Sequence, residues 1–179
     1  MTNFEIEACL QSMTVLVDPR ENPKTDRYEQ RVNSLSVPYR RQTLCYGDYT
    51  YNFTMPDGME LYSPSVTVSA PVIVERKMNL EELSSCFTQQ RDRFQAEFKR
   101  ASDNNAIIYL LVEDASWEKI IAGHYNTKFK PAAFIASLLG WSARYSIRLI
   151  FCKHEVSGKL IKELLYRELK QKLERGDYG

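Results

Sequence analysis

Short apolar runs rich in β-branched residues recur along this chain, and longer segments with helical periodicity separate them. Such runs predict buried strands, whereas the periodic segments predict amphipathic helices. Predicted strands span residues 14–17, 39–44, 48–53, 72–75, 106–113 and 147–151, and predicted helices span 26–35, 80–101 with a break near 86–90, 116–122, 131–145 and 157–173. Strands that alternate with helices indicate an α/β fold, here a three-layer sandwich with a central mixed sheet flanked by helices.

The composition is that of an ordinary globular domain. The chain has 179 residues, of which 44% are hydrophobic and 26% charged. A domain of this size buries roughly 70% of its unfolded surface, so we expect a single domain over residues 1–179. No segment is apolar for long enough to span a membrane, and the N-terminal residues do not have the pattern of a signal peptide.

Charge and cysteine usage exclude several classes of site. The formal net charge is +1, so any binding of nucleic acid needs a local basic patch rather than a global field. The four cysteines are widely spaced and form no Cys-x-x-Cys pair. Neither a zinc site nor a disulfide framework is therefore indicated.

The predicted strand at 72–75 leads into three charged residues, in the sequence Val74-Glu75-Arg76-Lys77. Because side chains alternate along a strand, Glu75 and Lys77 point the same way and Arg76 points to the other face. Asp48 follows a glycine and could bring a second carboxylate to the same place. Two carboxylates can hold a hard divalent cation such as Mg²⁺ or Mn²⁺, and a lysine can position a water or a phosphate.

These residues also have simpler interpretations. Asp18 ends the predicted strand at 14–17 and is a candidate third ligand, but it is equally a turn-forming residue before a proline. Asp48 could be an ordinary polar residue of a Gly-Asp turn, and Lys77 a solvated lysine at a strand end. The backbone carbonyl of Arg76, beside Glu75, is a further possible ligand.

Three motifs together resemble the XPF-type structure-specific nuclease family. They are Val17-Asp18-Pro19-Arg20-Glu21, Gly47-Asp48-Tyr49 and Val74-Glu75-Arg76-Lys77, in that order. The resemblance continues through 80–85, 91–94 and 107–113. It implies a restriction-endonuclease-like core of the PD-(D/E)XK kind, with Asp18, Asp48 and Glu75 as acidic metal-site residues and Lys77 as a catalytic residue.

The same resemblance suggests residues that support the site. Arg20 and Glu21 match the first motif, and Arg76 is expected to form an ion pair with Glu21 or Glu82. Glu81, which is one methylene longer, stands where the family usually has an aspartate and is a candidate supporting residue of the site. The connection from residue 49 to residue 74 is longer than is common in the family, and its turn at 57–58 suggests an extended hairpin.

Several basic residues are candidate contacts for a DNA backbone. They are Arg40, Arg41, Arg91, Arg93, Lys128 and Lys130. The last two flank Phe129 and follow Tyr125, and an aromatic beside a basic pair suits a loop that follows a nucleic-acid strand. Each of them alone could equally be an ordinary solvated charge.

The sequence thus predicts a metal-dependent DNA endonuclease, and the resemblance implies branched substrates such as flaps, forks or junctions in repair, recombination or replication. The alternatives are a non-catalytic DNA-binding scaffold that partners an active nuclease, and an unrelated α/β domain whose motifs coincide. The helix-hairpin-helix and helicase modules that accompany many relatives are not expected in residues 1–179. Branch recognition and dimerisation would then come from the nuclease domain itself or from a partner protein, and the resemblance implies a homodimer. The format suggests a bacterial or phage protein of the cytoplasm, associated with the nucleoid.

Overall fold

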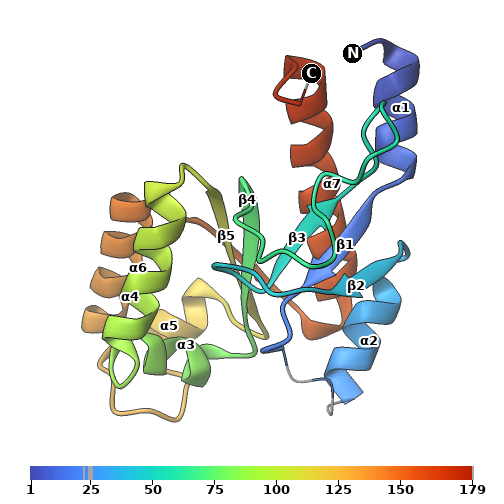
Figure 1. Ribbon diagram of the computed structural model, residues 1–179. Coiled ribbons are helices and arrows are strands. Elements are labelled where there is room, and N and C mark those ends of the chain that lie inside the picture. Colours follow the sequence, from blue (N-terminus) through green and yellow to red (C-terminus); the bar gives the residue numbers. More distant parts are fainter. Residues whose placement is uncertain (22, 24–25, 179) are drawn as a thin grey trace.

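The computed structural model describes residues 1–21, 23 and 26–178, which form a six-stranded sheet with helices on both faces (Figure 1). The strands are β1 (Thr14–Val17), β2 (Tyr39–Arg41), β3 (Tyr49–Asn52), β4 (Val72–Lys77), β5 (Ile107–Glu113) and β6 (Arg148–Cys152). The helices are α1 (Asn3–Gln11), α2 (Asp26–Ser34), α3 (Leu80–Phe87), α4 (Arg91–Asp103), α5 (Trp117–Ala122), α6 (Pro131–Tyr145), the 3₁₀ helix η1 (His154–Val156) and α7 (Ser157–Arg175). The predicted three-layer α/β sandwich is confirmed.

The sheet is mixed, with the order β2-β1-β3-β4-β5-β6. β1 is parallel to β2, β4 is parallel to β5, and β5 is parallel to β6, whereas β3 is antiparallel to both of its neighbours. The carboxyl ends of β1, β4 and β5 therefore meet the amino end of β3 at one edge of the sheet. The residues around Asp18, Asp48, Glu75 and Glu113 all lie at that edge.

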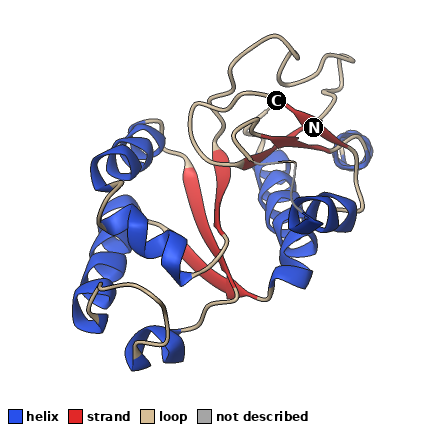
Figure 2. Ribbon diagram, turned by 90° about the horizontal axis from the view of Figure 1, so that it is seen from below, coloured by secondary structure: helices blue, strands red, loops and turns tan. Residues whose placement is uncertain are grey.

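Helices in two groups cover the sheet (Figure 2). One group contains α3, α4, α5 and α6, and the other contains α1, α2 and α7. Strand β4 is buried on both faces: Ile73 packs with the first group of helices, and Val72 and Val74 pack with the second. This double burial explains why the central strands are almost uninterrupted apolar runs in the sequence.

Local capping signals explain several helix boundaries. Asn79 caps α3 by accepting a hydrogen bond from the backbone N–H of Glu82, and the predicted break separates α3 from α4. Helix α1 was not predicted, although Thr2 and Glu5 form a reciprocal capping box at its start. Its apolar residues are spread around the helix and do not lie on one face, so the sequence shows no helical period there.

The connection between β3 and β4 turns at residues 57–58, as the sequence predicts. An antiparallel bridge joins Thr54 to Glu60, and the N–H of Leu61 donates to the carbonyl of Phe53 at 2.9 Å, so a hairpin continues beyond the end of β3. β3 and β4 themselves pair only around Tyr49 and Val74, and a parallel bridge joins Leu44 to Val68. Among the helices of the described part of the chain, none is long and apolar enough to cross a bilayer.

Candidate functional site

Asp48 lies between β1 and β4, because β3 pairs with both. Its backbone N–H donates to the carbonyl of Val74 at 3.0 Å, and its carbonyl accepts from the N–H of Asp18 at 2.8 Å. Its side chain accepts a hydrogen bond from the backbone N–H of Arg76 at 2.8 Å. Asp48 is thus held beside the charged end of β4, as the sequence predicts.

Gly47 makes this placement of Asp48 possible. Its φ is +75°, a left-handed conformation that favours glycine, and a Cβ atom here would lie 2.8 Å from the Cβ of Ile73. Its N–H donates to Oε1 of Glu97 on α4 at 3.1 Å. The turn before Asp48 is therefore fixed by a close approach to β4 and by a carboxylate from a distant helix.

Glu75 and Lys77 lie side by side, as the alternation along β4 predicts. The Lys77 Nζ is 2.5 Å from Oε1 of Glu75 and 5.1 Å from the ring centroid of Phe94. Glu75 is only 3% exposed, and its Oε2 has no hydrogen-bond partner among the described residues. A buried carboxylate oxygen without a partner is costly unless a cation or a water occupies the space before it.

A cavity of about 200 Å³ opens at this point. From the sheet edge it is lined by Arg20, Glu21, Asp48, Glu75, Arg76 and Lys77, and from α3, α4 and their connection by Glu82, Cys86, Gln90, Arg93, Phe94 and Glu97. Residues of all three sequence motifs therefore surround one cavity.

The charges in the cavity are strongly coupled. Burial, and then the charges of Glu75 and Glu21, raise the pKa of Asp48 well above its ordinary value. Burial also raises the pKa of Glu75, with a contribution from Glu97, although Lys77 acts to lower it. Burial alone would lower the pKa of Lys77, but Glu75 and Asp48 raise it above its ordinary value, so Lys77 is an ammonium. The positive charge near Asp48 and Glu75 thus does not fully compensate their two carboxylates, and their oxygen donors fit a hard divalent cation.

The family profile described as "ERCC4 domain" matches residues 17–164, which include every residue that lines this cavity. The chain belongs to the ERCC4 domain family. The resemblance of its motifs to XPF-type nucleases is therefore confirmed.

Solved structures agree with this assignment at the level of the fold. The chain is similar to XPF from Aeropyrum pernix, with 20% identity and a TM-score of 0.57 over 87% of this chain and 61% of that chain. It is also similar to XPF from Aeropyrum pernix in complex with DNA, with 22% identity and a TM-score of 0.58 over 89% of this chain and 66% of that chain. This chain thus spans less than two thirds of the length of either protein. A search of the curated proteins found no match.

Asp18 does not reach the cavity of this ERCC4 domain. Its carboxylate is fully buried and accepts hydrogen bonds from the N–H of Leu44 at 2.8 Å and from Nε of Arg20 at 2.7 Å. It also accepts from the backbone N–H of Arg20. Both oxygens of Asp18 accept hydrogen bonds from protein groups. Asp18 therefore holds Arg20 and the chain before Asp48 in place, and its position does not suit a metal ligand.

Glu81 also lies outside the cavity. Its Oε1 accepts from the N–H of Asn126 at 2.8 Å, which ties α3 to the connection between α5 and α6. The supporting role suggested for Glu81 is therefore not supported by its position. Its neighbour Glu82 lines the cavity instead, and it also accepts from the N–H of Met78.

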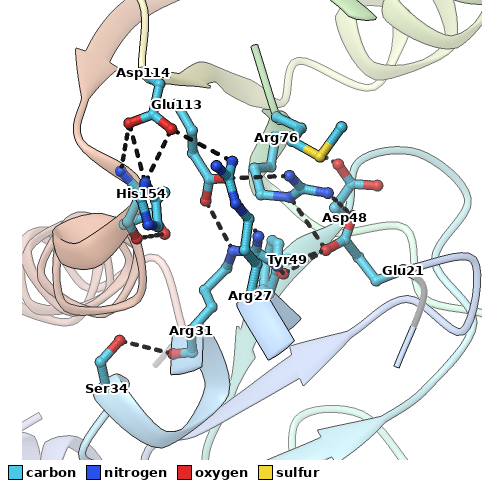
Figure 3. Close-up of polar contacts among 12 residues, drawn as sticks. Glu21, Arg27, Arg31, Ser34, Asp48, Tyr49, Arg76, Glu113, Asp114 and His154 are labelled. Atoms are coloured by element: carbon cyan, nitrogen blue, oxygen red, sulfur yellow. Dashed lines mark hydrogen bonds and ion pairs between the residues drawn. The ribbon is translucent and has the colours of Figure 1, made fainter. Parts of the chain in front are cut away.

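Arg76 is part of a buried ion-pair network behind the cavity (Figure 3). It donates to Oε1 of Glu21 at 2.9 Å and to Oε2 of Glu113 at 3.3 Å, so the expected pairing with Glu21 is confirmed. Arg31 bridges the same two carboxylates, at 3.1 and 3.0 Å, and the hydroxyl of Tyr49 donates to Glu21 at 2.7 Å. Although burial acts to raise it, the pKa of Glu21 is lowered by Arg76, Tyr49 and Arg31.

Sequence reasoning missed Arg31, Glu97 and Glu113, and it assigned no role to Tyr49 of the second motif. Glu113 could have been found, because it ends the strand next to β4 and so reaches the same edge of the sheet. No local pattern identifies Arg31 or Glu97, since each contacts the site only after the helix that carries it has packed.

The six predicted DNA contacts divide into two groups. Arg40 pairs with Glu60 at 2.9 Å, and Arg41 donates to the carbonyl of Pro19 at 2.6 Å, so both are tied to the fold near β2. The other four are exposed, and they are Arg91, Arg93, Lys128 and Lys130. Arg93 lines the cavity, and Lys128 lines a separate groove of about 530 Å³ along α3.

A second cluster of ligand-type side chains lies at the ends of β5 and β6. Asp114, His154 and Glu155 place potential donor atoms within 4.8 Å of one another. Asp114 is already bonded to Nδ1 of His154 at 2.9 Å and to Arg27 at 3.4 Å (Figure 3). Both carboxylate oxygens of Asp114 therefore have protein partners, unlike Oε2 of Glu75.

Proposed function

We propose that this ERCC4 domain is a metal-dependent DNA endonuclease. The observation that carries the proposal is the unpartnered Oε2 of the buried Glu75, which shares a cavity with Asp48 and Lys77. Asp48 and Glu75, with the backbone carbonyl of Arg76, would hold Mg²⁺ or Mn²⁺. The bound cation supplies Lewis-acid polarisation of a phosphate oxygen and lowers the pKa of a bound water.

Lys77 would stabilise negative charge on the phosphate. Its ammonium group is held by Glu75 and packed against Phe94, so its position is set before substrate arrives. Phosphoryl transfer depends mainly on positioning and on electrostatic stabilisation of the equatorial oxygens. Arg20 and Arg93, which also line the cavity, would orient the neighbouring phosphates of the strand.

The substrate we propose is branched DNA, such as a flap, a fork or a junction, processed during repair, recombination or replication. Two exposed arginines at the start of α4 and two exposed lysines before α6 would contact the DNA backbone. A local patch of this kind is what a domain of net charge +1 needs for binding DNA.

Recognition of a branch would come from a second copy or from a partner protein. Helix α6 exposes a face of small and apolar residues, including Ala132, Ala136, Leu139 and Ala143. Leu139 is 51% exposed. An exposed apolar helix face is typical of an interface, and we propose a homodimer through it. We place the protein in the cytoplasm of a bacterial or phage-infected cell, associated with the nucleoid.

The test is cleavage of labelled flap, fork, four-way junction and linear duplex DNA with Mg²⁺, with Mn²⁺ and with chelator. Glu75→Gln should fold normally and lose cleavage by at least about 100-fold, since it removes a charged donor from the cation site. Glu81→Gln is the matched control, because it removes the same charge six residues further on and outside the cavity. Cleavage that survives in Glu75→Gln would refute the proposal. A folded wild type that binds no Mn²⁺ and cuts nothing would support a non-catalytic scaffold instead.

A further inference from the structure

Glu97 is a buried carboxylate of the cavity that none of the three sequence motifs contains. It lies on α4, four residues after Arg93, so the two side chains share one face of the helix. Both line the cavity, yet Arg93 is exposed whereas Glu97 is only 7% exposed. A carboxylate is rarely buried to this extent unless other groups compensate its charge.

One oxygen of Glu97 holds the turn that positions Asp48. Oε1 accepts from the N–H of Gly47 at 3.1 Å, across 50 positions of the sequence. Because Gly47 directly precedes Asp48, this bond connects α4 to the proposed cation ligand just before β3. A neutral amide oxygen would accept the same hydrogen bond without the cost of burying a charge.

Arg20 compensates the charge of Glu97 only in part. Nη2 of Arg20 is 3.5 Å from Oε1 of Glu97, a long ion pair, and Nε of Arg20 bonds to Asp18 at 2.7 Å. The Arg20 side chain is 44% exposed at the mouth of the cavity, so solvent screens the pair. Glu97 therefore keeps much of its negative potential inside the cavity.

The other charges of the cavity do not balance it. Five carboxylates line the cavity, from Glu21, Asp48, Glu75, Glu82 and Glu97, against four cationic side chains. Lys77 is paired with Glu75 and Arg76 with Glu21, which leaves Asp48 without an ion pair among the described residues and Glu97 with only the long one to Arg20. The unpartnered Oε2 of Glu75 is a second and independent sign that the cavity is built for a positively charged ligand.

We propose that Glu97 is a positioning residue of the cation site, which fixes Asp48 through Gly47 and whose negative charge tightens the binding of a hard divalent cation. This inference rests on the proposed function and adds a third carboxylate to it. Outer residues of metal sites typically change metal affinity by 10- to 100-fold when they are substituted. The hydrogen bond and the charge can be separated experimentally, because each is retained in a different variant.

The experiment measures Mn²⁺ binding to the metal-free protein by calorimetry, together with cleavage as a function of Mn²⁺ concentration. Glu97→Gln keeps an acceptor for Gly47 but loses the charge. We expect its Mn²⁺ affinity to fall about 10-fold while its maximal cleavage rate, at saturating Mn²⁺, stays within about threefold of wild type. Glu97→Asp keeps the charge but is one methylene too short for Gly47. We expect it to keep its affinity and to lose maximal rate.

Asp92→Asn is the matched control, because it removes one negative charge from an exposed position of the same helix. If Glu97→Gln binds Mn²⁺ as tightly as wild type and Asp92→Asn, the inference is wrong while the proposed function stands. If the wild type itself neither binds Mn²⁺ nor cleaves DNA, both fail. The Asp variant keeps the test decisive should the Gln variant not fold, because equal maximal rates in Glu97→Asp and wild type would also overturn the inference.

Discussion

Substitution of Gly47 by alanine should separate the stability of the fold from the placement of Asp48. Gly47 has a φ of +75°, and a Cβ atom there would meet the Cβ of Ile73 at 2.8 Å and its Cδ1 at 2.9 Å. Ile73 is buried in the central strand β4 and cannot move aside without disturbing the core. We therefore expect the turn, and Asp48 with it, to shift away from β4.

The expected cost has two parts. An alanine in the left-handed region costs about 1–2 kcal/mol, and forcing a methyl group into a well-packed core costs about 1–3 kcal/mol. Gly47→Ala should therefore lose about 2–5 kcal/mol of the free energy of unfolding, which is a large share of the typical total. For a chain of this length each kcal/mol lowers Tm by about 2–4 °C.

Gly58→Ala is the matched control. Gly58 also has a positive φ, +85°, but nothing lies within 4 Å of its added Cβ. It should show the backbone cost alone, so Gly47→Ala should melt about 2–12 °C below it. Differential scanning calorimetry of the two variants, with cleavage assays on both, checks this. Equal Tm values, or full cleavage activity in Gly47→Ala, would refute the argument that close packing on Ile73 positions Asp48.

Three further predictions concern stability. Gly158→Ala should lose about 3 kcal/mol or more, since its Cβ would lie 2.1 Å from the carbonyl of Arg31, whereas Gly140→Ala on α6 meets nothing within 4 Å and should not destabilise; thermal melts of both check this. The pKa of Glu21 is lowered in the folded state, so the stabilisation by its carboxylate is present above the unfolded pKa of about 4.3 and is lost as pH falls through the folded pKa. Glu21→Gln should therefore lower the free energy of unfolding by about 3–5 kcal/mol at pH 7, measured by urea titration. A difference between the two proteins that persists at low pH would contradict this. The pKa of Asp48 is raised in the folded state, so stability is lost as pH rises from the unfolded pKa of about 3.9 through the folded pKa. Asp48→Asn should therefore raise the Tm of the metal-free protein at pH 7. A lower Tm would show that the ionised carboxylate does not destabilise the fold.

The parts of the site that follow from local geometry could be predicted from the sequence. The alternation of side chains along β4 is enough to bring Glu75 and Lys77 together and to turn Arg76 to the other face. The structure places all three side chains in this way. The apolar runs and the capping signal at Asn79 likewise predict the strands, the helix α3 and the α/β class. These inferences succeed because the interacting groups are neighbours in the chain.

The parts decided by tertiary structure join groups that are far apart in the chain. Asp18 is occupied by the N–H of Leu44, 26 positions away, Glu97 meets Gly47 at 50 positions, and Arg31 meets Glu113 at 82 positions. No local pattern carries information about such contacts, because they depend on which helix packs on which face of the sheet. The sequence by itself therefore determined which residues can do chemistry at the edge of the sheet. Only tertiary packing decided which carboxylates face the cavity and which are hydrogen-bonded within the surrounding fold. The reason is that a buried carboxylate must bind whatever donors the folded chain brings within about 3 Å.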